Sequence, residues 1–541
     1  MVTHETECII IGGGISGIVT ALELLDANQK IILFDRDRPE NFGGLAKESF
    51  GGIFFVNSPN QKKAGIKDSV ELAKDNWYSF ADFDDSDELP KQWANNFIEN
   101  CTNEVYIWLK EKGVKFFPVV HWVERGWHEP GNSVPRFHMV WGTGYGLINT
   151  LVNKVDTHPN RSKLEIFYKH RVSGLDISNG INTGCNGVNE EDGRAFEAKA
   201  TYTIIATGGI GGNIDLIKKV WGPTVGGAPE KLLNGSHRYA LGDLHDEVSR
   251  KQGKVTNLEK MWHYAAGIHH PNPNKSEHGL SIVPPKSALW LDYRGRRIGP
   301  EPLIAGYDTS FLVNEICKQK EKYSWQVMNK RIAVKEFAIS GAEHNKAIRD
   351  KKILPFLFNL LFGNKKLVDH MIRDCVDFVV ANSVEELVEK MNAINGDAKV
   401  DERLLKQSIE QYDENINRGK KYFNDEQLRR LAHLRQYRGD RVRTCNFQKI
   451  NDKKAYPLLA IRQFILSRKS LGGIQTDLSC QVVSNQSYSG KNYIEGLYAV
   501  GEAAGFGGGG IHGKRALEGT FLGTCIYTAR KAAQTIISNK S

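Results

Sequence analysis

Paired cysteines are absent from the sequence. Eight cysteines are scattered over 541 residues, and no two of them stand in a C-x-x-C arrangement. The sequence therefore predicts neither a zinc site nor a disulfide framework, and we expect no bound metal. Unpaired cysteines favour a reducing compartment, so we expect the protein to be cytoplasmic.

Long apolar runs and nucleic-acid-binding patterns are also missing. No uninterrupted apolar run approaches the roughly 18 residues that a membrane-spanning helix needs. The net charge of +9 is modest for this length, and no basic stripe with interleaved aromatic residues accompanies it. We expect a globular protein of two or three domains with no transmembrane segment and no nucleic-acid partner.

The N-terminal stretch carries the most specific pattern in the chain. Residues 8–11 form a short apolar run, residues 12–17 read GGGISG, and residues 18–25 carry the apolar stripe of a helix. A second apolar run over residues 31–34 ends on Asp35. A strand, a G-x-G-x-x-G loop, a helix, a strand and an acid at this spacing predict a dinucleotide-binding unit. The alternative is a glycine-rich turn in another kind of α/β unit.

Each residue type in this unit has a physical role. Gly12 allows the tight turn, Gly14 lets a pyrophosphate approach the backbone, and Gly17 lets the helix pack on the strand. The free N–H groups and partial positive charge at the helix start bind phosphates. Asp35 is suited to accept hydrogen bonds from the ribose hydroxyls. Since the unit starts so close to Met1, we expect no signal peptide before it.

Two later glycine-rich segments suit a fold that encloses the same ligand. Residues 43–52 read GGLAKESFGG, which suits a loop against an extended cofactor or, alternatively, a flexible surface turn. Residues 203–209 read TIIATGG, a strand that ends where the edge of a sheet is expected to meet a cofactor.

The composition changes in the middle of the chain. Glycine becomes rarer between residues 224 and 445, and lysine, arginine and asparagine increase. We therefore predict an α/β fold, in which a Rossmann-like domain of the glutathione-reductase type is interrupted by a large inserted α+β cap domain. The predicted boundaries are residues 1–223 and 446–541 for the first domain and 224–445 for the cap. A closing helix is expected from about Lys514 to Ala533.

Residues 353–362 form an unusually apolar segment between two lysine pairs, at 351–352 and 365–366. This composition suits a peripheral contact with a membrane surface, where a lipophilic substrate could be admitted. The alternative is ordinary core of the cap domain, because Pro355 interrupts any long helix.

Several of these stretches together resemble one family. Residues 12–17, 43–52, 206–209 and 497–502 are similar in order and spacing to the FAD-binding oxidoreductases of the fumarate reductase and succinate dehydrogenase flavoprotein family. Within it, residues 289–297, 307–309 and 515–523 look most like the 3-ketosteroid dehydrogenase branch and its uncharacterised FAD-binding relatives.

The resemblance implies FAD as the cofactor. The adenosine would lie at Asp35, the adenine beside Val172 and the ribityl chain at Glu502, with the start of the last helix near Leu517 directed at the flavin. The cofactor-binding residues that the resemblance and the dinucleotide pattern imply are Gly12, Gly14, Ile15, Ser16, Gly17, Asp35, Arg36, Gly43, Gly44, Leu45, Ala46, Val172, Ala206, Thr207, Gly208, Gly209, Asp243, Gly501, Glu502, Ala516 and Leu517.

The resemblance also implies an activity. Members of the family transfer a hydride between flavin N5 and a carbon–carbon bond adjacent to a carbonyl, so we expect an FAD-dependent dehydrogenase acting on CH–CH bonds. A small-molecule substrate, such as a ketosteroid-like or other lipophilic ketone, and an electron acceptor would be its partners. Two alternatives are a reductase of a small unsaturated carboxylic acid and a flavin-binding protein with little turnover.

Candidate catalytic residues follow from the same resemblance. Where fumarate reductases have an arginine and a histidine, this chain has Ala516, next to Arg515, and Lys469, which predicts poor fumarate reduction. Tyr307 and the aspartate after it match a tyrosine and aspartate of the ketosteroid branch, whose second tyrosine corresponds to Leu459 here. The alternative for Tyr307 is a packing role in the cap. Further candidates are Tyr145 and His512, although His512 also suits support of the flavin loop.

Overall fold

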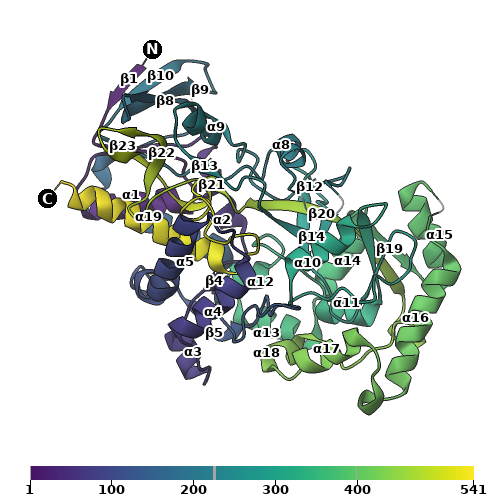
Figure 1. The fold of residues 1–541 in the computed structure, drawn as a ribbon. Helices are drawn as coiled ribbons and strands as arrows, with labels where there is room; N and C mark the ends of the chain where they lie inside the picture. The colour runs from purple at the N-terminus through teal and green to yellow at the C-terminus, as the bar shows by residue number, and fades with distance from the viewer. Residues whose placement is uncertain (1, 223–226, 398, 541) are drawn as a thin grey trace.

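The first domain is built on a parallel sheet that starts with the N-terminal unit (Figure 1). The computed structural model describes residues 2–222, 227–397 and 399–540. The parallel strands are, in order across the sheet, β23 (Lys491–Ala499), β11 (Tyr202–Ile205), β2 (Cys8–Ile11), β3 (Ile31–Phe34) and β7 (Leu164–Phe167). β2 and β3 are buried along their whole length, which explains their uninterrupted apolar runs.

A largely antiparallel extension widens this sheet beyond β23. It consists of β1 (Val2–Glu5), β8 (His170–Ser178), β9 (Ile181–Asn189), β10 (Ala195–Lys199) and β22 (Gln481–Tyr488). Two short strands, β13 (Val255–Thr256) and β21 (Gly473–Ile474), form a separate pair. Chain segments from both sides of the inserted region therefore contribute to one domain, as predicted.

Both ends of the chain contribute helices to this domain. Helix α1 (Ile15–Asp26) and the last helix, α19 (Thr520–Ser538), lie side by side and share one core (Figure 1). The last helix begins at Thr520 and not near Lys514, as the sequence had suggested. Gly519 has φ +97°, in the left-handed region, so the helix begins only after it.

The second domain is built around the long strand β20. Its strands are β12 (Leu233–Asn234), β14 (Met261–His269), β15 (Gly279–Val283), β16 (Leu289–Leu291), β17 (Tyr323–Asn329), β18 (Ala338–Ile339), β19 (Phe378–Ala381) and β20 (Leu458–Ser470). β20 pairs with β12, β14, β17 and β19, although it follows residue 446 in the sequence. The strand pairing thus extends the second sheet to Ser470, and the boundaries 223/224 and 445/446 stay a proposal.

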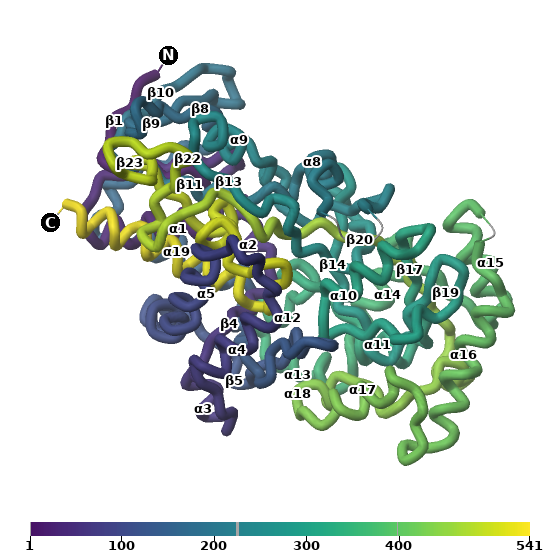
Figure 2. The backbone as a smooth tube through the Cα atoms, in the orientation of Figure 1, coloured from purple at the N-terminus to yellow at the C-terminus, as the bar shows by residue number. Residues whose placement is uncertain are grey.

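Helices cover this second sheet and extend to the edge of the molecule, where α15 and α16 are found (Figure 1). They are α10 (Thr309–Cys317), α11 (Lys330–Glu336), α12 (Lys346–Arg349), α13 (Ile353–Phe362), α14 (Lys365–Asp374), α15 (Val384–Asn395), α16 (Glu402–Asn417), α17 (Glu426–Leu434) and α18 (Arg438–Arg443). Figure 2 follows the chain from the first domain into the second and back along β20.

Residues 44–156 contain a small third sheet and several helices, which lie beside the first sheet. Its strands β4 (Gly52–Phe54), β5 (Phe116–His121) and β6 (Phe137–Val140) make a small antiparallel sheet. Its helices are α2 (Gly44–Glu48), α3 (Pro59–Lys63), α4 (Val70–Ala81), α5 (Glu88–Asn100), α6 (Trp108–Glu111) and α7 (Thr143–Asp156). Of the remaining α-helices, α8 (Ile214–Lys219) contributes Ile217 to the core of the second domain, and α9 (Asp243–Arg250) packs on β8 of the first domain. Among all described helices, none has the length and apolar character needed to cross a bilayer.

Candidate functional site

A large cavity lies between the two domains. It has a volume of about 1330 Å³ and is lined by residues that follow β2, β3 and β11 as well as by residues of β14 and β15. Pockets for one small ligand usually measure about 300–1,000 Å³, so this cavity has room for a dinucleotide and a substrate together. The carboxyl ends of parallel strands are where α/β proteins bind such ligands.

The glycine loop contains two kinds of glycine: some pack against the backbone, and one faces open space. A Cβ atom on Gly12, which has φ +109°, would lie 2.5 Å from the carbonyl oxygen of Ala206, and one on Gly17 would lie 2.0 Å from that of Gly12. Gly14 differs: its φ is −71°, and a Cβ there would meet no protein atom within 4 Å. The space beside Gly14 is therefore free for a pyrophosphate, and the cradle fits FAD.

The second glycine loop lies against the first. Gly43 pairs with Gly14 in an isolated bridge, and the Gly43 N–H donates to the Gly13 carbonyl at 2.8 Å. Helix α1 starts between them, with its first N–H groups available to an anion. Residues 43–52, which include helix α2 and the start of β4, thus lie against the cofactor space and are not a free surface turn.

Asp35, directly after β3, is held in place beside the glycine loop. One carboxylate oxygen accepts a hydrogen bond from the Gly13 N–H at 3.0 Å, and the other accepts one from the Asp37 N–H at 2.8 Å. Burial raises the pKa of this carboxyl above its ordinary value. Beside it, Arg36 forms ion pairs with Glu190 at 2.8 Å and Asp243 at 3.4 Å.

Most of the expected cofactor residues line this cavity. They are Gly12, Gly14, Ile15, Ser16, Asp35, Arg36, Gly43, Gly44, Leu45, Ala46, Val172, Ala206, Thr207, Gly208, Gly209, Asp243 and Glu502. Gly17, Gly501, Ala516 and Leu517 are buried behind the lining. At the last helix, Gly519 and Phe521 line the cavity in place of Ala516 and Leu517, because the helix starts later than the sequence suggested.

A hydrogen-bonded chain of largely half-buried polar side chains lies where the cavity meets the second sheet. Tyr264 of β14 donates its phenol hydrogen to Glu518 Oε1 at 2.7 Å, and Trp262 Nε1 donates to the same oxygen at 3.0 Å. Lys469 of β20 donates to the Tyr264 oxygen at 3.0 Å. Because β14 and β20 are neighbouring strands and Glu518 immediately precedes Gly519, the group lies next to the start of α19.

The environment shifts the acidity of these groups in opposite directions. Burial lowers the pKa of Lys469 to about 8, against the attraction of Glu518. Burial, and then the negative charge of Glu518, raises the pKa of Tyr264 well above 10, so this side chain stays a neutral phenol at pH 7. Glu124, a second buried carboxyl of the lining, has its pKa raised by burial and by Glu518. Such displaced pKa values within a cavity are typical of sites that move protons.

Of the five candidate catalytic residues, one lines the cavity and four do not. Lys469 lines the cavity, whereas Tyr145, Tyr307, His512 and Arg515 do not. The Tyr307 hydroxyl lies 3.2 Å from His433 Nδ1, and its ring packs within the core of the second domain. Tyr145 is on the outer side of α7.

The last two candidates support neighbouring structure. His512 Nε2 lies 2.8 Å from the Thr520 hydroxyl, and its ring stacks on Trp77 at 5.6 Å, so it supports the loop before α19. Arg515 forms an ion pair of 3.5 Å with Asp308. The sequence reasoning missed Tyr264 and Glu518; Glu518 lies inside the similar stretch 515–523, but nothing in the sequence pairs it with Tyr264.

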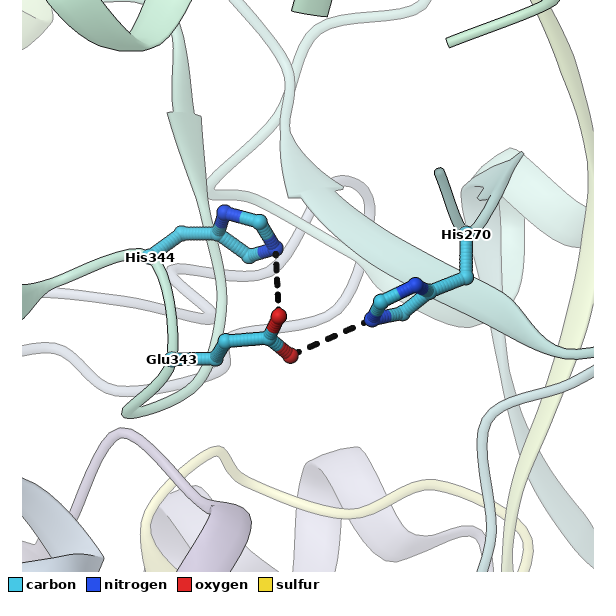
Figure 3. A group of neighbouring side chains, drawn as sticks. All are labelled: His270, Glu343 and His344. Carbon is cyan, nitrogen blue, oxygen red and sulfur yellow. Dashed lines mark hydrogen bonds and ion pairs between the residues drawn. The ribbon is translucent and has the colours of Figure 1, made fainter. Parts of the chain in front are cut away.

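One group among the described residues has the side-chain types of a metal site (Figure 3). Glu343 lies between His270 and His344, with its carboxylate oxygens 3.1 Å from His270 Nε2 and 3.7 Å from His344 Nε2. His270 Nδ1 accepts a hydrogen bond from the Asn272 N–H at 2.9 Å, so the ring hydrogen is on Nε2 and is directed at Glu343. A metal on Nε2 would displace this hydrogen. We therefore assign the group a structural role: it ties the loop before α12 to the end of β14.

Comparison with known proteins places this geometry in a family. Residues 7–522 match the family described as FAD binding domain. A protein of Mycobacterium tuberculosis (strain CDC 1551 / Oshkosh) named KsdD-like steroid dehydrogenase is 39% identical over 98% of this chain and 95% of its own length.

Two solved structures share the fold. The 3-ketosteroid Δ1-dehydrogenase of Sterolibacterium denitrificans has a TM-score of 0.69 and 14% identity over 99% of this chain and 100% of its own. A flavocytochrome c3 fumarate reductase also has a TM-score of 0.69, with 17% identity over 99% of this chain and 78% of its own. At these identities the fold alone is shared.

The glycine loop generates a prediction about cofactor binding. We expect Gly14→Val to fold normally and to bind FAD roughly ten- to hundredfold more weakly, because overpacking of the phosphate space costs about 1–3 kcal/mol. Absorbance of the flavin after gel filtration measures FAD binding, and the melting temperature without FAD measures folding. Gly12→Val is the matched comparison: its positive φ and the nearby Ala206 carbonyl should prevent folding even of the FAD-free chain. Full FAD occupancy in Gly14→Val would contradict this assignment of the phosphate site.

Proposed function

Because the chain belongs to the FAD binding domain family, we propose that it is an FAD-dependent dehydrogenase that oxidises a carbon–carbon bond next to the ketone of a steroid-like, lipophilic substrate. The observation that carries this proposal is the hydrogen-bonded chain of Lys469, Tyr264 and Glu518 in the lining of the cavity. The name of the relative at 39% identity supports the substrate class. We also propose the cytoplasm as its location, since all eight cysteines are buried and free.

The cavity offers a suitable environment for such a substrate. Beyond the flavin cradle, apolar side chains from both domains line it, among them Phe117, Phe137, Met139, Ile282, Leu312, Ile339, Phe356 and Leu360. An apolar pocket with a small number of placed polar groups binds a largely hydrocarbon ligand and fixes its orientation. The ketone, as the polar end, would be directed to Tyr264 and Lys469.

Bound FAD supplies the acceptor for the two electrons that leave the substrate as a hydride. The accompanying proton leaves the carbon next to the ketone, and we assign its uptake to Tyr264. As the C–H bond breaks, the Tyr264 oxygen gains this proton while its own hydrogen passes to Glu518 Oε1, which lies 2.7 Å from the Tyr264 oxygen. Trp262 holds that carboxylate oxygen in place through its N–H.

Lys469 makes this transfer easier through its charge. Its ammonium group lies 3.0 Å from the Tyr264 oxygen and stabilises the negative charge that develops there. In a buried site this attraction is stronger than it would be in water. The same groups serve the reverse reaction, in which Tyr264 returns a proton to the carbon.

Reduction of a small unsaturated acid is the second candidate, since a fumarate reductase shares the fold. Ala516, which corresponds to the arginine of that family, is fully buried and is absent from the cavity lining. Loss of one charged group of that kind typically costs about a hundredfold or more in rate. We therefore favour the ketone dehydrogenase.

A direct comparison of substrates tests this preference. Under anaerobic conditions, we expect a 3-ketosteroid to bleach the flavin absorbance of the FAD-loaded enzyme. In a dye-coupled assay, we expect the enzyme to reduce fumarate at least about a hundredfold more slowly than a steroid enone. Efficient fumarate turnover, with no bleaching by any ketosteroid, would sink the proposal. Flavin that remains oxidised with ketosteroids and acids alike would favour a flavin-binding protein with little turnover.

Two matched tyrosine substitutions test the proton path. Tyr264→Phe should retain the flavin spectrum and lower the rate of flavin reduction by about 10²–10⁴-fold, the usual contribution of a general acid or base. Tyr307→Phe should remain close to wild type, because its hydroxyl contacts His433 within the second domain. The reverse result, with the loss confined to Tyr307→Phe, would return the catalytic role to the residue suggested by the family resemblance.

The pH dependence of flavin reduction tests Lys469. The charged form of this lysine predominates below its pKa of about 8, so the rate should fall as the pH rises through 8. Lys469→Arg should remove this decline, since arginine stays protonated, whereas Lys469→Met should be slow at every pH. A decline near pH 8 that persists unchanged in Lys469→Met would assign the titration to another group.

A further inference from the structure

Helix α13 exposes an apolar face to solvent. None of its ten residues is buried, although nine of the ten are apolar side chains. Six large apolar residues are between 41% and 76% exposed, namely Ile353, Leu354, Leu357, Phe358, Leu361 and Phe362. The cap-core alternative for this segment is therefore wrong. Contiguous exposed apolar surface of this kind marks a site of interaction.

The exposed residues form one continuous stripe. They occur as pairs at spacings of four, 353–354, 357–358 and 361–362, which places them along one side of the helix. The opposite side is fixed to the protein: the ring of Phe356 packs on Phe117 at 5.1 Å, and Lys335 Nζ donates to the Leu361 carbonyl at 2.9 Å. The helix is thus anchored with its apolar stripe facing outward.

Positive charge borders this stripe at both ends. Lys351 and Lys352 precede the helix, and Lys365 and Lys366 follow it; all four are exposed. None of them takes part in an ion pair with another described residue. Lysines without acidic partners beside an apolar face complement a surface that is apolar inside and anionic outside.

The stripe coincides with the mouth of the cavity. Ile353, Leu357 and Leu361 are exposed and also line the cavity. Val119 of β5 shares both properties, with 47% of its surface exposed. Residues that belong to both surfaces mark the place where the cavity opens to solvent. A ligand that leaves an apolar phase at this place would enter the cavity directly.

We propose that α13 docks the protein onto the surface of an anionic phospholipid membrane. The apolar stripe enters the region between headgroups and acyl chains, and the four flanking lysines contact the anionic headgroups. The cavity mouth then faces the membrane, so a lipophilic substrate dissolved there has a short path to the active site. Docking itself does not depend on the proposed reaction, because binding to lipid requires no substrate.

Flotation of the FAD-loaded full chain with vesicles tests the docking. We expect binding to vesicles of phosphatidylcholine and phosphatidylglycerol in equal parts, and weaker binding to phosphatidylcholine alone. Leu354→Glu combined with Phe358→Glu should lower the affinity for the mixed vesicles at least about tenfold, since two large apolar side chains are lost from the interface. Lys365→Gln combined with Lys366→Gln should weaken binding to the mixed vesicles only, by about fivefold per lysine.

Tyr422→Glu is the matched control. Tyr422 is 70% exposed and follows Lys420 and Lys421, so it has the same local chemistry as α13, but it belongs to a different part of the second domain. This variant should bind vesicles as the wild type does. Flavin absorbance reports whether each variant has folded.

Three results would overturn the proposal. The first is wild-type protein that fails to float with the mixed vesicles, and the second is equal binding by the Leu354 and Phe358 double variant. The third is a concentration-dependent dimer in sedimentation velocity that this double variant abolishes, because α13 would then contact a second copy of the chain. Turnover of a ketosteroid in solution is measured separately, so failure of docking and failure of the proposed reaction remain distinguishable.

Discussion

The close approach of two backbone segments at Gly12 is the constraint on which the rest of the structure depends. The Cα of Gly12 lies so near the Ala206 carbonyl that no side chain fits between β2 and the loop after β11. This contact aligns the carboxyl ends of strands from residues 8–11 and 202–205. The phosphate cradle, the placement of Asp35 and the position of the last helix all follow from that alignment, because each is built on the same sheet edge.

The cofactor half of the site could be predicted from the sequence because its determinants are local. The strand, glycine loop, helix and acid lie within thirty residues, and each has a periodic or conformational signal of its own. The structure adds a detail that fits the same logic: Asp35 accepts a hydrogen bond from Gly13, two elements earlier. By contrast, the start of the last helix was placed too early, since helical periodicity gives no information about the left-handed conformation of Gly519.

The residues that we propose for proton transfer could not be predicted from the sequence, for a physical reason. Tyr264 is 254 residues from Glu518 and 205 from Lys469. The pairing of β14 with β20 brings Tyr264 to Lys469, and the segment just before α19 adds Glu518. A strand alternates its two faces, so a shift of one residue in register would direct Tyr264 away from the cavity. The family resemblance pointed instead to Tyr307, whose side chain packs in a core that the sequence could not delimit.

The polar lining around Tyr264 and the apolar mouth at α13 together explain the proposed specificity better than either does alone. Beside the second sheet the cavity presents charged and hydrogen-bonding groups, and a ligand that buried only apolar surface there would leave the charges of Glu518 and Lys469 with no solvation beyond their hydrogen bonds to Trp262 and Tyr264. Its mouth is formed by the apolar stripe of α13, where a strongly hydrated ligand gains nothing. A molecule with one polar end and a hydrocarbon body satisfies both conditions if the polar end enters first. That orientation would bring the ketone to Tyr264, next to the carbon that must lose its proton. The proposed selectivity for a lipophilic ketone over a small dicarboxylic acid thus follows from the order in which the cavity presents apolar and polar surface.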